Sequence, residues 1–271
     1  MPELPDVEIF RQYLQSTVLH KKIRSVSVAE TALLEGVDRS EFSQSLRGHS
    51  FEKTRRHGKY CFLVLDNRRC LFLHFGMTGF VQYFKKKLQA PEHTRLSFEF
   101  TNDYTLAYDC QRKFGEFGIT DDLEDFIASQ DLGPDALDDN LSEDDFVRLL
   151  EKRRGMLKPA LMNQQIIAGI GNIYSDEILF QLRLHPKISL HQLDEKKLRQ
   201  IYATTREILV KAVKANAEPE NMAASMLTRH RRGDGKCPNC RASIEKIEVA
   251  GRRARYCPSC QGDAKDNGHE R

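Results

Sequence analysis

Residues 237–260 read CPNCRASIEKIEVAGRRARYCPSC, which spaces four cysteines as C-x2-C-x16-C-x2-C. Each C-x2-C pair presents two thiolates from one tight turn, and two such pairs suit the tetrahedral coordination of Zn²⁺. Because Cys237, Cys240, Cys257 and Cys260 would fill all four positions, we predict one structural zinc ion with no position left for catalysis. Such an ion would hold together a hairpin that has almost no hydrophobic core.

The segment around these cysteines is basic. Residues 228–260 contain nine Lys or Arg against three acids, a local charge of +6. The sequence between the two pairs predicts a hairpin with Arg252, Arg253 and Arg255 near its tip and on its second strand. A concentrated positive charge at one end of a nearly neutral chain indicates a polyanionic partner. A solubilising surface or a protein contact would explain the same composition.

Upstream of the hairpin the sequence predicts a helical block at residues 142–228. Ser142 followed by Asp145 resembles a capping box at the start of a helix. The stretch AGIGNIYSDEILF (residues 168–180) places Gly169 and Gly171 in a tight turn and Asn172 at the start of another helix. Free N–H groups at a helix N-terminus bind anions, so this turn is a candidate phosphate site.

Short alternating apolar runs dominate the preceding part of the chain, from about residue 22 to residue 120, and predict a β-sandwich or barrel. These runs are IRSVSV, YCFLVLD, CLFLHF, GFVQYF, RLSFEF and YTLAYD. Before them, apolar residues at helical spacing predict a helix over residues 6–19. Pro5 and Asp6 suit the first turn of that helix.

Composition sets the remaining limits. The chain has 271 residues, of which 40% are hydrophobic and 30% charged, as expected for a folded protein with more than one domain. It contains no apolar run near the roughly 20 residues of a membrane helix, and its first residues do not read as a signal peptide. We therefore expect a cytoplasmic protein without disulfides, in which Cys61, Cys70 and Cys110 are small core residues.

We divide the chain by these patterns. Residues 121–145 hold eleven acids and no Lys or Arg, which indicates a connector. The predicted parts are a helix with a β-sandwich (1–120), the acidic connector (121–141), a helical domain (142–228), a zinc-finger hairpin (229–262) and a disordered tail (263–271).

Four motifs in this order resemble a known family. MPELPDVE (residues 1–8), RRHGKY (55–60), GIGNIYSDE (169–177) and the four-cysteine finger are similar to those of the formamidopyrimidine-DNA glycosylase/endonuclease VIII family. The match is closer to the formamidopyrimidine-DNA glycosylase branch, whose members typically begin PELPEVE. The resemblance implies an α+β multidomain fold, with an N-terminal helix on a β-sandwich, a helix-two-turns-helix domain and a C-terminal zinc finger.

The resemblance also implies a bifunctional base-excision repair enzyme, a DNA glycosylase and abasic-site lyase, that acts on duplex DNA. Its nucleophile would be the nitrogen of Pro2 after removal of Met1, because an α-amino group has a pKa of about 7.7–8.0 and is partly unprotonated at neutral pH. Glu3 would act as general acid/base, and Lys59 would donate a proton from a β-turn. Asp6 stands where the family usually has Glu, and we expect it to support the site rather than react.

Further DNA contacts follow from the resemblance. Residues of three types fill the gap left by the flipped base, and their counterparts here are Met77, Arg112 and Phe114. The positions that grip phosphates in the family correspond to Lys158, Asn172 and Arg252. The acids Asp176 and Glu177 are interpreted as structural. The implied protein is a monomer that acts on the bacterial chromosome in the cytoplasm.

The lesion that the protein recognises stays open. Residues 216–236, NAEPENMAASMLTRHRRGDGK, lack the Gly-Tyr/Phe-Phe and Val-Tyr-Gly-Arg patterns that the glycosylase branch carries after its last long helix. Oxidised purines such as 8-oxoguanine and formamidopyrimidines are the first expectation, and oxidised pyrimidines are the alternative. Two other classes also fit parts of the sequence: a non-catalytic relative that binds damaged DNA, and a zinc-finger adaptor for RNA or protein.

Overall fold

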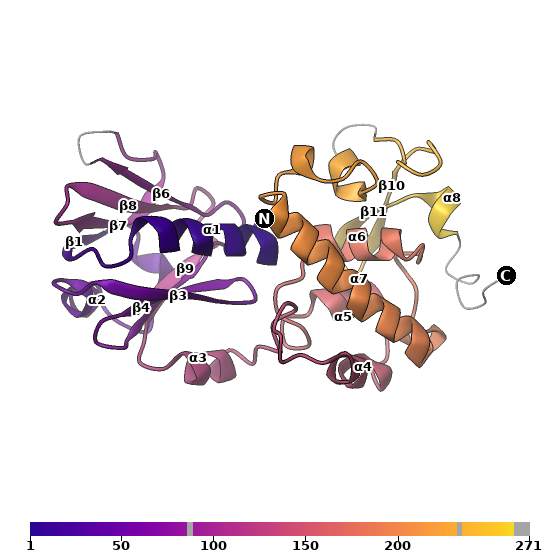
Figure 1. The fold of residues 1–271 in the computed structure, drawn as a ribbon, viewed down its shortest axis with the longest axis horizontal. Helices are drawn as coiled ribbons and strands as arrows, with labels where there is room; N and C mark the ends of the chain where they lie inside the picture. The colour runs from indigo at the N-terminus through magenta and orange to yellow at the C-terminus, as the bar shows by residue number, and fades with distance from the viewer. Residues whose placement is uncertain (86–88, 232–234, 263–271) are drawn as a thin grey trace. The chain divides into compact units, whose positions relative to one another are not determined.

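The computed structural model describes residues 1–85, 89–231 and 235–262, and these form two compact units (Figure 1). The first unit contains Met1–Pro2 and Asp6–Asp131, and the second contains Glu3–Pro5 and the chain from Leu132 onward. The tail predicted at residues 263–271 lies outside the described residues. The mixed helix and sheet content agrees with the predicted α+β class.

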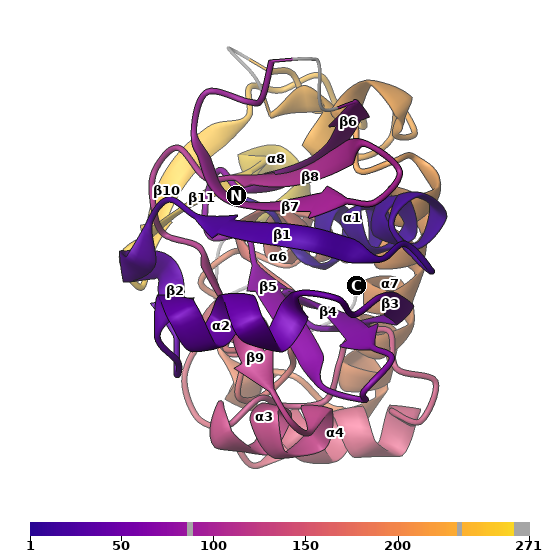
Figure 2. The same cartoon turned by 90° about the vertical axis from the view of Figure 1, so that its left-hand side faces the viewer.

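Two sheets face each other in the first unit (Figure 2). The four-stranded sheet has the order β1 (Ile23–Val28), β7 (Thr94–Phe100), β8 (Tyr104–Asp109), β6 (Phe80–Lys85). The five-stranded sheet has the order β2 (Leu34–Glu35), β9 (Glu116–Thr120), β5 (Cys70–His74), β4 (Tyr60–Leu65), β3 (Phe51–His57). Neighbouring strands are antiparallel except β2 and β9, which pair in parallel.

Helix α1 (Leu4–Thr17) packs along the sandwich where both sheets reach it (Figures 1 and 2). Its Phe10 ring lies 4.6 Å from the ring of Phe75, and the backbone N–H of Tyr83 donates to the hydroxyl of Tyr13 at 2.8 Å. Leu14 is fully buried with the aromatic side chains of both sheets. The apolar spacing in the sequence therefore marks the face of α1 that is buried.

The predicted strand region also contains a helix that the sequence analysis missed, α2 (Arg39–Leu46), after a short 3₁₀ turn, η1 (Thr31–Leu33). Its N-cap is Asp38, whose carboxylate accepts from two backbone N–H groups. Within the predicted acidic connector lies α3 (Leu123–Ser129), and its Phe126 ring is 4.5 Å from the ring of Phe72. The acidic run is thus partly helical and packs on the five-stranded sheet.

The described part of the second unit that precedes the finger contains the helices α4 (Glu143–Glu151), α5 (Leu157–Met162), α6 (Asn172–Gln181) and α7 (Glu195–Lys214). A short 3₁₀ turn, η2 (Leu190–Gln192), lies between α6 and α7, and two more, η3 (Pro219–Asn221) and η4 (Leu227–His230), follow α7. The predicted capping box is confirmed, since Ser142 and Asp145 exchange both hydrogen bonds at the start of α4. Leu4 is buried in the hydrophobic core of this unit although it begins α1.

The finger consists of the hairpin β10 (Glu245–Val249) and β11 (Arg252–Tyr256), followed by the short helix α8 (Pro258–Gln261). A small core joins it to α6, because Phe180 packs with Leu227, Cys237 and Cys257. The hairpin predicted between the cysteine pairs is therefore present, with Arg252 and Arg253 exposed on its second strand. The described part of the chain contains no helix with the length and apolar content of a membrane span.

Candidate active site and nucleic-acid interface

The N-terminal end of α6 binds the carboxylate of Glu3. Three backbone N–H groups donate to this carboxylate: Gly171 at 2.9 Å, Ile173 at 2.7 Å and Tyr174 at 3.2 Å. Glu3 is completely buried, and it belongs to the same unit as α6. The first N–H groups of a helix have no partner within the helix, and the helix dipole favours a negative charge there. The side chain of Glu3 is thereby fixed immediately after Pro2.

The glycines of the GIGN turn are needed because the start of the chain lies against them. A Cβ atom on Gly171 would fall 2.4 Å from the Cδ of Glu3, and one on Gly169 would fall 2.5 Å from the Cδ1 of Leu4. The N–H of Leu4 also donates to the carbonyl of Gly169 at 3.0 Å. The prediction that this turn binds a phosphate through its free N–H groups is therefore wrong for the groups that Glu3 occupies.

Lys158 is buried rather than exposed. Its ammonium donates to the carbonyl of Asn172 at 3.3 Å, to the hydroxyl of Ser175 at 2.7 Å and to the carboxylate of Asp176 at 2.7 Å. Burial lowers the pKa of Lys158, and the charge of Asp176 partly offsets this effect. Lys158, which the resemblance predicted to bind a phosphate, therefore binds groups in the first turns of α6.

Asp176 and Glu177 are structural, as interpreted from the sequence. Asp176 also accepts from the guanidinium of Arg231 at 2.6 Å and from the backbone N–H of Arg255 at 2.9 Å. Glu177 accepts from the backbone N–H of Thr228 at 2.7 Å and from its hydroxyl at 2.6 Å. Both carboxylates are buried, so they join α6 to the finger and to the segment that precedes it. No local pattern in the sequence marks Arg231 or Thr228 as partners of α6.

Asn172 contacts the finger hairpin, and Arg252 belongs to it as the first residue of β11. The side-chain amide of Asn172 donates to the carbonyl of Arg253 at 3.0 Å, while its buried Oδ1 has no hydrogen-bond partner among the described residues. Arg252 is exposed and lines a cavity of about 190 Å³ in the second unit. The other residues that line this cavity are Lys158, Pro159, Met162, Asn163, Val249 and Ala250.

Lys59 occupies the turn between β3 and β4 in the first unit. His57 and Tyr60 pair across the strands, so Gly58 and Lys59 form a two-residue turn in which Gly58 has a φ of +54°. The ring of His74 packs against that of Tyr60 at an angle of 36°, with centroids 4.9 Å apart. Burial together with the charge of Lys59 lowers the pKa of His74 to about 4. The His74 imidazole beside Lys59 is therefore neutral at pH 7. On its other neighbour, Tyr60, the hydroxyl donates to the carboxylate of Glu116.

Pro2 directly precedes the buried Glu3, and Asp6 follows it three positions later. Pro2 is half-buried and is assigned with Met1 to the first unit, as is Lys59. Asp6 is half-buried in the first turn of α1, where an acidic side chain suits the helix dipole.

The structure brings Met77, Arg112 and Phe114 together on two touching loops of the first unit. Met77 is 37% exposed and Phe114 is 60% exposed, which are large values for apolar side chains. The guanidinium of Arg112 lies over the Phe114 ring at 5.2 Å from its centroid. A Cβ atom on Gly76 would fall 2.3 Å from the backbone carbon of Phe114, so the two loops are in direct contact. They form an exposed apolar and cationic cluster.

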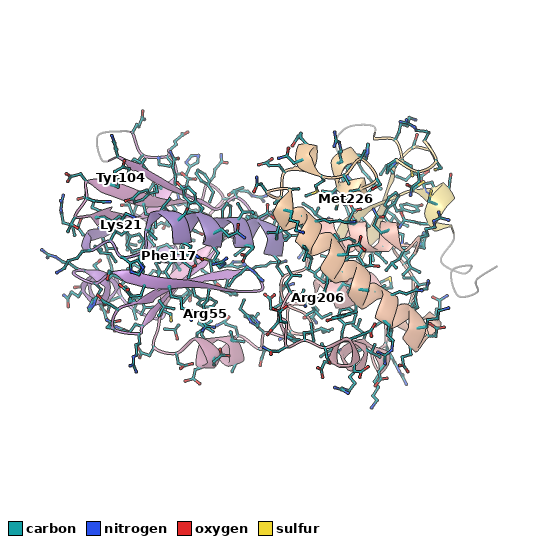
Figure 3. The ribbon with its side chains drawn as sticks, viewed as in Figure 1. Lys21, Arg55, Tyr104, Phe117, Arg206 and Met226 are labelled. Atoms are coloured by element: carbon teal, nitrogen blue, oxygen red, sulfur yellow. The ribbon has the colours of Figure 1, made fainter. Side chains whose placement is uncertain are left out.

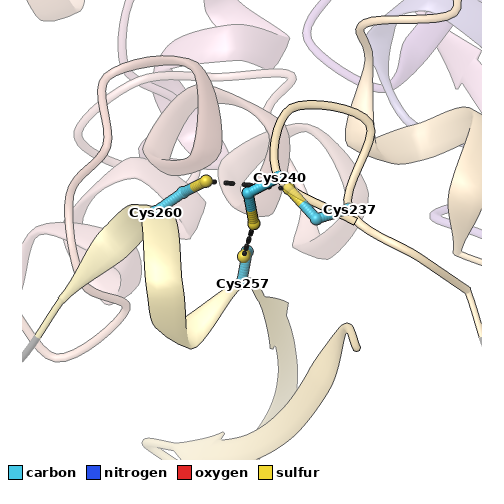
Figure 4. Close-up of side chains that lie close together, drawn as sticks. All are labelled: Cys237, Cys240, Cys257 and Cys260. Carbon is cyan, nitrogen blue, oxygen red and sulfur yellow. Dashed lines mark hydrogen bonds between the residues drawn. The ribbon is translucent and has the colours of Figure 1, made fainter. Parts of the chain in front are cut away.

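The four finger cysteines converge on one point (Figure 4). All four sulfur atoms lie within 4.8 Å of one another, with 3.7 Å between Cys237 and Cys260 and 3.4 Å between Cys240 and Cys257. A tetrahedral ion with metal–sulfur bonds of about 2.3 Å needs sulfur atoms roughly 3.8 Å apart. Hydrogen bonding, chiefly at the Ala242 backbone, lowers the pKa of Cys240 to about 7. The four thiols fit a closed metal site.

Three family models match the chain in order. The formamidopyrimidine-DNA glycosylase N-terminal domain matches residues 1–117, and the formamidopyrimidine-DNA glycosylase H2TH domain matches residues 132–223. The zinc finger found in FPG and IleRS matches residues 235–262.

Complete proteins are similar as well. The formamidopyrimidine-DNA glycosylase of Protochlamydia amoebophila is 32% identical over 96% of this chain and 99% of that protein. That of Listeria monocytogenes serotype 4b is 31% identical over 96% of this chain and 100% of that protein. Among solved structures, the Lactococcus lactis enzyme bound non-covalently to DNA with an abasic site gives a TM-score of 0.86 at 29% identity, covering 96% of this chain and 100% of that one.

The contact between Glu3 and Gly171 predicts a thermodynamic coupling. Gly171→Ala should destabilise the protein because the new methyl group displaces the carboxylate, and most of this cost should vanish in a Glu3→Ala background. We expect a coupling free energy of about 1–3 kcal/mol in a double-mutant cycle measured by urea unfolding. Gly155→Ala serves as the control for coupling: its φ of +99° makes the substitution itself destabilising, but no described atom lies within 4 Å of the Cβ position, so its cost should be the same with and without Glu3→Ala. A cycle with no coupling between residues 3 and 171 would contradict the geometry.

Proposed function

The chain belongs to the formamidopyrimidine-DNA glycosylase family, and we propose that it both excises an oxidised base and cleaves the strand at the resulting abasic site. Family membership makes it a DNA glycosylase of base excision repair. The observation that carries the proposal is the anchoring of Glu3 by three N–H groups of α6, directly after Pro2. This anchor restricts where the adjacent proline nitrogen can lie.

In this proposal the nucleophile is the secondary amine of Pro2, exposed once Met1 is removed. The nitrogen attacks C1′ of the damaged nucleotide, and the bond from C1′ to the base breaks as the base leaves with a proton. The ring oxygen O4′ then takes up a proton through Glu3 as its bond to C1′ breaks, and the lone pair of the proline nitrogen forms the C=N bond of an iminium ion. Its positive charge acidifies C2′, so removal of a C2′ proton breaks the bond to the 3′ phosphate by β-elimination. A second, δ-elimination then releases the 5′ phosphate.

Three side chains support these steps. Glu3 moves protons at the sugar as general acid/base, from a position fixed by its three N–H donors. Lys59 donates a proton from its two-residue turn, beside an imidazole that stays neutral. Asp6 orients groups near the start of α1 without reacting, one methylene shorter than the glutamate usual in the family.

The partner in this proposal is duplex DNA that carries a damaged base or an abasic site. Met77, Arg112 and Phe114 fill the gap left by the flipped nucleotide, because they form one exposed cluster of apolar side chains and a guanidinium. Asn172 and Arg252 contact phosphates. Lys158 supports this contact indirectly, since its ammonium holds the carbonyl of Asn172. The enzyme acts as a monomer in the cytoplasm, on the bacterial nucleoid.

We assign Zn²⁺ to the four-cysteine site. Two C-x2-C turns with four converging sulfur atoms match the coordination that structural zinc prefers. The bound ion would supply folding energy to the hairpin that carries Arg252, and it would take no part in the reaction.

The expected lesions are oxidised purines, 8-oxoguanine and formamidopyrimidines. The alternative substrates are oxidised pyrimidines. They are favoured because residues 216–236 lack the aromatic patterns of the glycosylase branch. Within this stretch Met222 and Met226 are 2% and 3% exposed and belong to the core of the second unit. Arg229 donates to the carbonyl of Met222 at 2.8 Å, which further holds residues 222–229 in place. A segment engaged in this way differs from an aromatic loop that closes over a purine.

The nucleophile can be tested by substitution. In Pro2→Gly the primary amine forms an imine that is neutral unless protonated, so C2′ is less acidic and strand cleavage should fall roughly 10²-fold or more. Binding to duplex with a stable abasic analogue should change little. A preparation that retains Met1 is the matched control and should be equally inactive. Full strand cleavage by Pro2→Gly would contradict the proposal.

A substrate panel decides the lesion class. Single-turnover excision rates are measured on otherwise identical duplexes that contain 8-oxoguanine, a formamidopyrimidine, or an oxidised thymine. We expect the purine-derived lesions to be excised fastest. A preference for the oxidised pyrimidine by about tenfold, equivalent to 1.4 kcal/mol, would instead support the alternative.

The metal assignment has its own test. Cys240→Ser should release the bound zinc, measured by elemental analysis, and weaken DNA binding by at least about tenfold because the hairpin with Arg252 loses its support. Cys70→Ser, at a buried cysteine of the first unit, should keep the zinc. Normal DNA affinity in the zinc-free Cys240→Ser variant would show that the finger is not a gripping element.

A further inference from the structure

One guanidinium group joins helix α1 to the turn that carries Lys59. The Nε of Arg56 donates to the carboxylate of Glu8 at 3.2 Å, and its Nη1 donates to the carbonyl of Gly58 at 3.1 Å. The Arg56 side chain is 9% exposed and that of Glu8 is 17% exposed. Hydrogen bonds between charged groups that are largely shielded from water are stronger and less mobile than exposed ones.

The Glu8 end of this bridge is fixed on α1 itself. Arg11 donates to both oxygens of Glu8, from Nη2 at 2.7 Å and from Nε at 3.0 Å, and Gln12 donates to the same carboxylate at 3.0 Å. Burial tends to raise the pKa of Glu8, but these donors outweigh it and the pKa is lowered. Glu8 is therefore an ionised acceptor at neutral pH, held by residues three and four positions further along its own helix.

The Gly58 end controls the position of Lys59. The carbonyl that accepts from Arg56 belongs to the peptide bond between Gly58 and Lys59, so the guanidinium holds the turn where Lys59 begins. The turn has only two residues, which leaves few ways to rotate this peptide without breaking the pairing of His57 with Tyr60. Arg56, Glu8, Lys59 and Pro2 all belong to the first unit.

We propose that Arg56 is a positioning residue, which holds the Lys59 turn at a fixed distance from α1 through Glu8 and the carbonyl of Gly58. This inference rests on the proposed function, in which Pro2 precedes α1 as nucleophile and Lys59 delivers a proton. The bridge sets the geometry between the two reacting groups without touching the DNA.

Arginine is required because the two acceptors lie on different edges of its planar group. A guanidinium presents Nε and Nη donors in fixed directions, whereas the single ammonium of lysine cannot reach a carboxylate and a separate carbonyl with the same geometry. A displacement of a catalytic group by about 1 Å can cost on the order of 10²-fold in rate. Loss of the bridge should therefore slow the reaction while DNA binding is kept.

The test compares Arg56→Ala with Arg55→Ala, its neighbour on β3, whose side chain is exposed (Figure 3). Single-turnover cleavage of a duplex with a preformed abasic site should slow by about 10–10²-fold in Arg56→Ala. Affinity for duplex with a stable abasic analogue should stay within about twofold of wild type, since the bridge makes no phosphate contact. Arg55→Ala should match wild type in both measurements.

Chemical rescue separates positioning from general stability. Added guanidinium chloride should restore a large part of the rate of Arg56→Ala, compared with sodium chloride at equal ionic strength. Arg56→Lys should remain slow and show no rescue. Glu8→Gln, which keeps the size of the side chain but removes its charge, should be slow in the same step, and its effect should not add fully to that of Arg56→Ala.

The proposal is overturned by a wild-type rate in Arg56→Ala. It is also overturned by a slow variant that guanidinium does not rescue although circular dichroism and melting match wild type. If Arg56→Ala fails to fold, the rate of Glu8→Gln decides, and a wild-type rate there overturns the proposal. Retention of strand cleavage by Pro2→Gly would refute the proposed function instead, so the two failures are distinguishable.

Discussion

The structure depends on the hydrogen bonds between the carboxylate of Glu3 and the first turn of α6. A fully buried carboxylate without partners would be strongly destabilising, and here the partners are N–H groups that the helix cannot satisfy internally. The Glu3 carboxylate and the N–H groups of α6 therefore satisfy each other's hydrogen bonds. The interaction explains why residue 171 is a glycine, and the contact of Leu4 explains the same for Gly169. Residues Glu3–Pro5 belong to the second unit, whereas the residues before and after them belong to the first.

The same helix collects other buried charges. On α6, the carboxylate of Asp176 accepts hydrogen bonds from Lys158, from Arg231 and from the backbone N–H of Arg255. The carboxylate of Glu177 accepts from the backbone N–H of Thr228, in the segment before the finger. Buried ions of this kind add little net stability compared with apolar residues, but removing one partner leaves an uncompensated charge. We infer that these two carboxylates fix the finger and Lys158 in one arrangement on α6, next to Asn172.

Much of the fold could be predicted from the sequence, because it is encoded locally. The cysteine spacing, the apolar alternation of β4 to β8 and the capping box at Ser142 each depend on residues close in the chain. Strand β3 was missed because FEKTRRH is mostly polar, and α2 because only two of its residues are buried. For the site, the family resemblance supplied a set of candidate residues, whereas their geometry could not be predicted from the sequence.

What local patterns could not show are pairings across long sequence separations. Glu3 meets Gly171 across 168 positions, and Lys158 pairs with Asp176 inside the protein, so a helix N-terminus and a lysine that looked available for phosphate are both occupied.

The most direct test of the proposed nucleophile is tandem mass spectrometry of the complex trapped by borohydride on abasic DNA. We predict a deoxyribose adduct on the nitrogen of Pro2 in chains without Met1. An adduct on another side chain, or none from correctly processed protein, would contradict it.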